Sequence, residues 1–279
     1  MKYANLHLHS HYSDASFTPY QLAILGKSLG YGALALTDHE TDAGVKEFIV
    51  ACDKLGLESL YGVEFYGAHD GHVPHLVALD FDYDAPVFRN FVKERCDAEC
   101  ECTRKRVERG IRLGFIQDLT WNDVLDYARP GSWICIDHVI GAMKHKGVME
   151  PTDNGMELRL NVFKGEEAKS FEEPYPTAER VIKIIRKADG IAVLAHPVSK
   201  VQYVRELVDY GLNGIEVCHP IVDEQTAALA MEAAKTYRLY CSGGTDHSGP
   251  MGGFSEHAFP CWHGATEEEF RIIKERKLG

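Results

Sequence analysis

Short apolar runs of strand type recur along this chain, and most of them are bordered by a histidine, an aspartate or a glutamate. The first run ends in His7-Leu8-His9. Alternate residues of a strand point to the same side, so these two imidazoles leave the strand together. Imidazoles and carboxylates are common protein ligands of divalent transition metals. Similar side chains border later runs, namely His39, Glu64, His75, His196 and Asp246. The pattern predicts a metal-dependent hydrolase whose metal site is assembled from strand ends.

The spacing of the runs predicts an α/β fold. Strands that alternate with helices usually pair in parallel through right-handed crossovers, which leaves an α/β barrel or an open doubly wound sheet. Because active sites gather at the carboxyl ends of barrel strands, the ligand positions favour the barrel. The expected strands lie near residues 4–8, 33–37, 59–64, 75–79, 191–195, 214–218 and 239–243, and the expected helices near 19–30, 43–55, 177–188, 201–210 and 223–236.

The alternation stops in the middle of the chain. Residues 88–115 are highly charged and predict one helix, and residues 136–147 predict another. Residues 152–174 are polar and are expected to form an exposed loop. We therefore expect a barrel with a mostly helical cap inserted over its mouth. The barrel would comprise residues 1–85 and 176–279, and the cap residues 86–175.

Charge and composition limit the possible partners. The net charge of −12 repels polyanions, so no long nucleic acid is expected as a partner. A small phosphorylated substrate is compatible, because bound cations reverse the local sign of a site. No run approaches the roughly 18 apolar residues of a membrane span, and the chain opens without a secretory leader pattern. We expect a cytoplasmic protein with reduced cysteines and no membrane partner. The sequence leaves the oligomeric state open.

The candidate ligands are too many for one ion. They are His7, His9, Asp14, His39, Glu64, His75, His196 and Asp246. Two or three divalent ions are therefore expected, and a cage of histidines and carboxylates suits manganese, iron or zinc better than magnesium. A carboxylate such as Glu64 can bridge two cations that share a hydroxide for attack. Glu64, Asp246 and His39 are the candidate catalytic residues.

The order of these motifs resembles a known family. The chain carries H-x-H-x4-D, T-D-H, G-V-E, P-H-x-V, A-H-P and G-T-D in succession. This order resembles the PHP family (polymerase and histidinol phosphatase) of metal-dependent phosphoesterases over almost the whole chain. The insertion after the His75 run is similar to that of the nucleotide-phosphatase-like branch. The resemblance implies a distorted seven-stranded (β/α) barrel and three metals. It implies that the first metal takes His7, His9, Glu64 and Asp246, the second takes Glu64, His75 and His196, and the third takes Asp14 and His39.

One departure from the family pattern concerns the third metal. The family usually closes with D-x-H, whose histidine completes that site. Here His247 follows Asp246 directly, and Ser248 stands at the expected position. We expect His247 to reach the third metal through a rearranged turn, because the nearby glycines allow unusual backbone angles. The alternative is a weak third site.

Other departures concern phosphate binding. The related insertion carries an arginine two residues before a histidine, whereas Ile136 precedes His138 here. After A-H-P the relatives continue with glycine and often arginine, but this chain continues with Val198-Ser199-Lys200. The substitute anion binders are His138, Lys200, Arg104 and Lys144, each of which is otherwise a solvated charge. His219 ends another strand and is a candidate for contact with the substrate or the leaving group.

Together the motifs predict a small-molecule phosphoesterase that acts through metal-activated water. The expected substrate is a sugar phosphate, a nucleotide or a cyclic phosphate, and clustered cations would stabilise the charge on its phosphoryl oxygens. One alternative is an amidohydrolase-type C–N hydrolase, which also begins with H-x-H but often bridges its metals through a lysine carbamate; Glu64 ends the strand here. Another is a nuclease acting on short nucleic-acid ends, which the negative charge disfavours. The departure at His247 leaves a non-catalytic metal-binding regulator open.

Overall fold

The structure contains two sheets, and the predicted ligands are divided between them. The structure, a computed structural model, describes residues 2–247, 249 and 263–278. The five-stranded sheet has the order β4 (Gly62–Tyr66), β5 (His75–Leu79), β6 (Ile191–Leu194), β7 (Gly214–Cys218) and β8 (Tyr240–Gly243). A three-stranded parallel sheet contains β1 (Ala4–Asn5), β2 (Ala33–Ala35) and β3 (Glu58–Leu60). The predicted α/β class is confirmed.

The expectation of parallel strands throughout was wrong for β5. This strand is antiparallel to both of its neighbours, β4 and β6, with Tyr66 opposite His75 and Leu76 opposite Leu194. The eight residues 67–74 that join β4 to β5 are too few for the crossover that parallel pairing needs. As a consequence, the first residue of β5 lies at the same sheet edge as the last residues of β4 and β6.

The two sheets meet at isolated bridges rather than along a continuous ladder. Leu8 bridges His247, and His39 bridges Glu64. The expected strand 59–64 is divided at Tyr61 between β3 and β4, which belong to different sheets. The strand pairing among the described residues gives two sheets, so a closed seven-stranded barrel stays a prediction.

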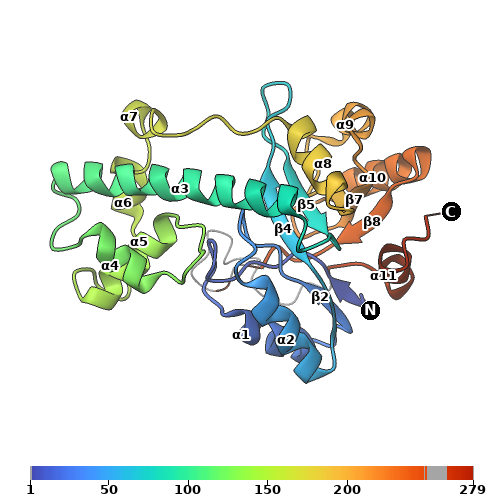
Figure 1. Cartoon of the computed structure of the whole chain (residues 1–279), viewed down its shortest axis with the longest axis horizontal. Helices are drawn as coiled ribbons and strands as arrows, with labels where there is room; N and C mark the ends of the chain where they lie inside the picture. Colours follow the sequence, from blue (N-terminus) through green and yellow to red (C-terminus); the bar gives the residue numbers. More distant parts are fainter. Residues whose placement is uncertain (1, 248, 250–262, 279) are drawn as a thin grey trace.

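Helices cover the outer faces of both sheets (Figure 1). α1 (Pro19–Ser28) and α2 (Val45–Leu55) pack beside β2, where Leu22 and Phe48 are buried with Leu34. The larger sheet is covered by α8 (Ala178–Lys187), α9 (Val204–Tyr210) after the short 3₁₀ turn η1 (Val201–Tyr203), and α10 (Glu224–Tyr237). The sequence did not predict α11 (Glu267–Lys274), whose Phe270 is buried against the sheets. In the part of the chain that the structure describes, no helix has the length and apolarity needed to cross a membrane.

The inserted segment has an apolar cluster of its own. It begins with α3 (Pro86–Arg112), a long helix that runs from β4 and β5 to the far side of the molecule (Figure 1). There it meets α4 (Trp121–Tyr127), α5 (Ile136–Lys146), α6 (Met156–Asn161) and α7 (Glu166–Lys169). The separate cluster includes Val107, Ile116, Val124, Val139 and Leu158. The loop expected at 152–174 is partly wrong, because α6 and α7 lie within it. The division into barrel and cap stays a prediction.

Candidate metal centre

Glu64 lies at the centre of the predicted ligands. It belongs to β4 and is 1% exposed. Its Oε2 atom lies 3.2 Å from His7 Nε2, 3.2 Å from His9 Nε2 and 3.2 Å from His39 Nδ1. His7 and His9 follow β1 and His39 follows β2, so three imidazoles from the smaller sheet converge on one carboxylate oxygen.

The second oxygen of Glu64 faces two histidines of the larger sheet. Glu64 Oε1 lies 3.0 Å from His75 Nδ1 and 3.3 Å from His196 Nε2. His196 follows the carboxyl end of β6, whereas His75 opens β5. The reversed direction of β5 brings His75 to the ligand edge. Both histidines were predicted to share Glu64, and the structure brings all three together.

Two aspartates complete the cluster. Asp246 Oδ1 lies 3.0 Å from His9 Nε2 and 3.7 Å from His7 Nε2. Asp14 lies 3.8 Å from His9 Nδ1 and 3.7 Å from His39 Nε2. The ligand atoms of His7, His9, Glu64 and Asp246 converge, as do those of His9, Asp14 and His39, and those of His39, Glu64 and His75. The first of these groups is the set expected for the first metal.

The donor set fits divalent cations. His7 Nε2, both ring nitrogens of His9, His39 Nδ1 and Glu64 Oε2 are buried, and no hydrogen bond satisfies them among the described residues. Buried polar atoms are rarely left in this state unless an ion or a water meets them. Two histidines and two carboxylates facing one point form a cage typical of zinc, iron or manganese.

The charges of the centre suit metal binding. Burial alone would raise the pKa of Glu64, but His7, His39 and His75 together lower it well below its usual value. Burial is also the main cause that lowers the pKa of His39 to about 4. At neutral pH Glu64 is therefore ionised and His39 is neutral, which is the form in which each binds a cation.

The sequence analysis missed Glu216, which lies on β7 and is 1% exposed. Its Oε1 lies 2.9 Å from His7 Nδ1, and its Oε2 accepts a 2.6 Å hydrogen bond from the backbone N–H of His196. The available signal was one carboxylate within the apolar run Ile215-Glu216-Val217. Because β7 is an interior strand of the larger sheet, a buried charged residue in it needs buried partners.

His219, one of the predicted substrate contacts, is buried at the rim of the centre. Its Nδ1 accepts a 3.3 Å hydrogen bond from the backbone N–H of Ile221, so its Nε2 carries the proton of the neutral ring. That Nε2 lies 3.6 Å from Asp246 Oδ2. His219 therefore faces a predicted ligand, and its role toward substrate stays a prediction.

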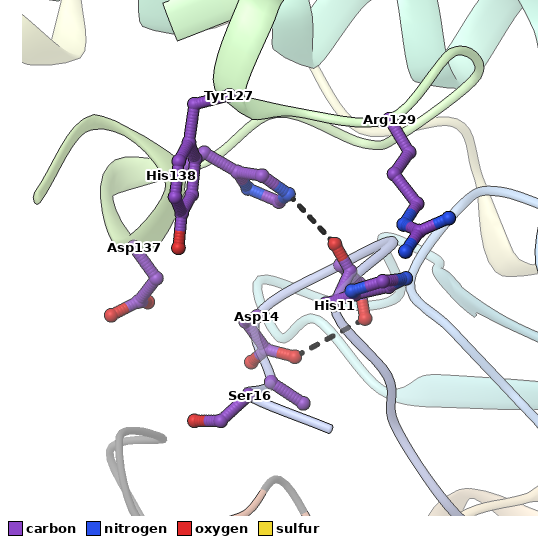
Figure 2. A pocket seen from close by; sticks show the side chains of 9 residues that line it. His11, Asp14, Ser16, Tyr127, Arg129, Asp137 and His138 are labelled. Atoms are coloured by element: carbon purple, nitrogen blue, oxygen red, sulfur yellow. Dashed lines mark hydrogen bonds between the residues drawn. The ribbon is translucent and has the colours of Figure 1, made fainter. Parts of the chain in front are cut away.

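A pocket of about 250 Å³ lies between the 11–16 loop and the inserted segment (Figure 2). The loop contributes the predicted ligand Asp14, and the insertion contributes Tyr127, Arg129 and Asp137. The full lining is His11, Ser13, Asp14, Ala15, Ser16, Tyr127, Arg129, Asp137 and His138. The loop that carries Asp14 and the inserted segment therefore line one cavity. Arg129 was not singled out from the sequence, where it is one exposed arginine among many.

His138 lines this pocket, but both of its ring nitrogens have backbone partners. Nδ1 accepts from the N–H of Cys135, and Nε2 lies 3.0 Å from the carbonyl oxygen of His11, to which it donates (Figure 2). His138 thus ties α5 to the loop between His9 and Asp14. Its role as a substrate ligand stays a prediction.

The two predicted cations differ in their surroundings. Lys200 is half-buried, and burial lowers its pKa although the charge of Glu64 opposes the shift, so it lies near the centre. Arg104 instead pairs with Glu101 and Glu108 on its own helix. It is absent from the pocket lining among the described residues, where Arg129 is the arginine. Lys144 is likewise absent from that lining.

Comparison with known families assigns the chain to one of them. Residues 5–185, more than half of the chain, match the PHP domain family. This chain is a member of the PHP family. The resemblance drawn from the ordered motifs, and with it the assignment to a family of metal-dependent phosphoesterases, is confirmed.

Relatives of this PHP protein with recorded activities span nearly its full length. A phosphoribosyl 1,2-cyclic phosphate 1,2-diphosphodiesterase of Eggerthella lenta is 27% identical, covering 89% of this chain and 95% of the relative. A 3′,5′-nucleoside bisphosphate phosphatase of Chromobacterium violaceum is 27% identical, with coverage of 88% and 87%. A 5′-3′ exoribonuclease of Haemophilus influenzae is 26% identical, with coverage of 89% and 90%.

Solved structures support the fold. A metal-dependent phosphoesterase from Bifidobacterium adolescentis, so described in its structure, superposes with a TM-score of 0.79 at 24% identity, over 100% of this chain and 97% of the other. A Chromobacterium violaceum protein described as an amidohydrolase gives a TM-score of 0.76 at 21% identity, over 98% and 96%. At these identities the likeness establishes a shared PHP-like fold.

The departure from the closing PHP motif lies at the edge of the described residues. Ser248 is outside them, so its predicted position as the replacement for the family histidine is not described. The His247 ring packs 5.6 Å from that of Phe17, centroid to centroid. Among the described residues His247 belongs to none of the converging ligand groups. Its role as a ligand of the third metal stays a prediction.

Proposed function

We propose that this PHP protein hydrolyses a phosphate ester of a small phosphorylated compound, such as a sugar phosphate, a nucleotide or a cyclic phosphate. The observation that carries the proposal is the convergence of five imidazoles on Glu64 beside a pocket that contains Asp14. The relatives named as a cyclic phosphate diphosphodiesterase and a bisphosphate phosphatase support this choice of substrate class.

We propose two or three divalent ions, of manganese, iron or zinc, as the cofactors. The first would be held by His7, His9, Glu64 and Asp246, the second by Glu64, His75 and His196, and the third by Asp14 and His39, completed by His247. When bound, such ions neutralise the charge of the phosphoryl group and lower the pKa of water.

The chain's own residues orient the reaction. Glu64, ionised and buried, keeps the imidazoles from both sheets directed at one point. Asp246 faces His9 Nε2 at 3.0 Å on one side and the Nε2–H of His219 at 3.6 Å on the other. Lys200, half-buried near Glu64, and Arg129 supply positive charge at the margin of a cluster rich in carboxylates. These cations are suited to hold phosphoryl oxygens.

We further propose that residues 86–175 form a cap that covers the substrate. The segment is fixed to the loops of the metal centre at several points. The backbone N–H of Trp133 donates to the carbonyl of Tyr12 at 2.9 Å, and Thr41 Oγ1 donates to the carbonyl of Gly131 at 2.6 Å. The bridges at Leu8 and His39 support a distorted barrel beneath this cap, in which the two sheets form one wall.

A second candidate is hydrolysis at short nucleic-acid ends. The exoribonuclease of Haemophilus influenzae matches this chain with nearly the same identity and coverage as the phosphatases. The net charge of −12 opposes binding of long RNA, but a terminal nucleotide needs only the pocket and the metals.

A hydrolysis screen tests these alternatives, with released phosphate measured for the monoesters and with chromatographic separation of the products for the cyclic phosphates and RNA. Protein loaded with Mn²⁺ would be incubated with sugar phosphates, nucleoside bisphosphates, cyclic phosphates and short 5′-phosphorylated RNA, each beside the Glu64→Gln variant. Metal-dependent turnover of a small compound, absent from the variant, is the expected result. Turnover confined to RNA would favour the nuclease. No hydrolysis of any phosphate ester, with metals bound, would contradict both.

A further inference from the structure

One buried carboxylate connects two predicted ligands that come from different sheets. Glu216 on β7 contacts His7, 209 positions earlier in the chain, and His196, 20 positions earlier. It is 1% exposed, and both of its oxygens are occupied by nitrogen donors of these two residues. Glu216 is not among the ligands that the family resemblance implies.

The contact with His7 decides which ring nitrogen can bind a cation. A neutral imidazole carries one proton, and a carboxylate can only accept a hydrogen bond. With Glu216 Oε1 at 2.9 Å, the proton belongs on His7 Nδ1. The lone pair of Nε2 then points at Glu64 Oε2 at 3.2 Å and Asp246 Oδ1 at 3.7 Å. With the proton on Nδ1, the three acceptors that face one another are free to serve as ligands of one cation.

The contact with His196 fixes a strained turn. His196 has a φ of +25°, a left-handed conformation that non-glycine residues rarely adopt. Glu216 Oε2 accepts the N–H of this residue at 2.6 Å. The turn carries His196 Nε2 to within 3.3 Å of Glu64 Oε1. Releasing the N–H would free the backbone to relax and would move the imidazole away from Glu64.

We propose that Glu216 is a positioning residue of the metal centre. It sets the tautomer of His7 and holds the turn of His196, so that two histidines from different sheets present their lone pairs toward Glu64. The inference concerns the same centre on which the proposed function rests. Partners of this kind behind metal-bound histidines usually contribute 10–100-fold to metal affinity.

Zinc affinity measured against a competing chelator tests the proposal without any substrate. Glu216→Gln keeps the shape but offers one acceptor oxygen, which can serve His7 or His196 but not both. We expect its affinity for zinc to fall by about 10-fold. Glu216→Leu offers no acceptor oxygen, and its affinity for zinc should fall by up to about 100-fold. The number of ions bound at saturating zinc should stay unchanged in both.

A matched control separates positioning from stability. Val217→Ala truncates the next residue of β7, which packs in the apolar cluster beneath α10. It should lower the midpoint of thermal unfolding yet leave zinc affinity at the wild-type value. In the zinc-loaded protein, the Nδ1 proton of His7 should exchange slowly with solvent in NMR spectra of wild type and Val217→Ala. It should exchange rapidly in Glu216→Leu.

Two results would overturn the proposal. The first is a zinc affinity within twofold of wild type in both Glu216→Gln and Glu216→Leu, with both variants folded. That result would show that Glu216 does not position the histidines. If Glu216→Leu fails to fold, the Gln variant alone decides. Loss of one bound ion with unchanged affinity for the rest would make Glu216 a ligand instead, in the group that it forms with His7 and His219. Phosphate release by wild-type protein is scored separately, so failure of the proposed function leaves these zinc results interpretable.

Discussion

The carboxylate of Glu64 is the residue on which the centre depends most. One side chain offers each of its two oxygens to a different sheet: Oε2 to His7, His9 and His39, and Oε1 to His75 and His196. Removing the charge of Glu64 should therefore weaken every predicted metal site that it borders. Loss of any single histidine should weaken only the sites on the same side of Glu64.

Glu64→Gln should preserve the fold, lower the bound metal and abolish turnover. The amide is isosteric, but its NH₂ group cannot accept a cation, so one side of the centre loses its shared ligand. Metal analysis after dialysis and the phosphate-release assay measure the effect. Glu99→Gln, at a glutamate of α3 outside the centre, is the control and should retain metal. Near-normal activity in Glu64→Gln would remove this residue from the catalytic set.

His138→Ala should weaken substrate binding but leave metal content unchanged. Its Nε2 donates to the carbonyl of His11 in the loop before Asp14, and its Nδ1 accepts from the N–H of Cys135 within the inserted segment. Each hydrogen bond contributes about 1 kcal/mol. Without the ring the pocket wall is less well fixed, so we expect kcat/KM to fall about tenfold. His145→Ala, at an exposed position of the same helix, should behave like wild type. If His138→Ala lowers only the unfolding midpoint, the residue is purely structural.

Among the elements, β3 and α11 are joined by one carboxylate. Glu58 lies 2.7 Å from Arg271 and 2.5 Å from Lys274, and Tyr3 donates a 2.7 Å hydrogen bond to it. Burial raises the pKa of Glu58, but the bonds from Lys274, Tyr3 and Arg271 outweigh it and lower the pKa from 4.5 to about 2. This cluster fixes α11 to the three-stranded sheet.

Glu58→Gln should lower the free energy of unfolding by about 1 kcal/mol at pH 7, since the group is partly exposed and solvent screens it. A carboxyl whose pKa is depressed by folding stabilises the protein above its unfolded pKa, here 4.5, and loses that effect as pH falls toward about 2. Urea unfolding measures the free energy of unfolding of wild type and Glu58→Gln. The difference between the two proteins should be constant between pH 5 and pH 7 and should become smaller below about pH 4.5. A difference that grows on acidification would contradict this assignment.

The elements also show how far the sequence could predict the structure. The strand-end ligands were predictable because each motif is local and directly borders an apolar run. The direction of β5 could not be predicted from its histidine. A histidine at the start of an antiparallel strand and a histidine at the end of a parallel strand reach the same edge of the sheet. Glu216 was missed because its partners lie 209 and 20 positions away. Arg104 was predicted from helix charge, but charges spaced by three or four residues pair with each other.

At the scale of the whole molecule, the metal centre joins the two sheets. The candidate ligands come from β4 and β5 and from the segments after β1, β2, β6 and β8, and no continuous ladder joins the sheets among the described residues. We therefore expect bound cations to help hold the two sheets together.

Removal of metal should lower the unfolding temperature by about 5–10 °C. An ion at about 100 times its dissociation constant stabilises a folded protein by about 2.7 kcal/mol, which corresponds to such a shift in a chain of this size. Thermal unfolding measured in the presence of a chelator, and again after Mn²⁺ is added back, gives the two unfolding temperatures. The shift should be smaller in Glu64→Gln. Equal midpoints with and without bound metal would mean that the sheets hold together independently of the centre.

The reversed direction of β5 also separates the tip of one hairpin from the strand pair that places His75. His75 is placed by its pairing with Tyr66, and the tip of the hairpin lies beyond that pair. Asp70 and Gly71 at the tip are exposed and have φ of +46° and +74°, as in a two-residue hairpin turn. Residues added between them would extend into solvent without shifting the register of either strand. The hairpin tip is therefore the place to attach a fluorophore or an affinity tag to this enzyme.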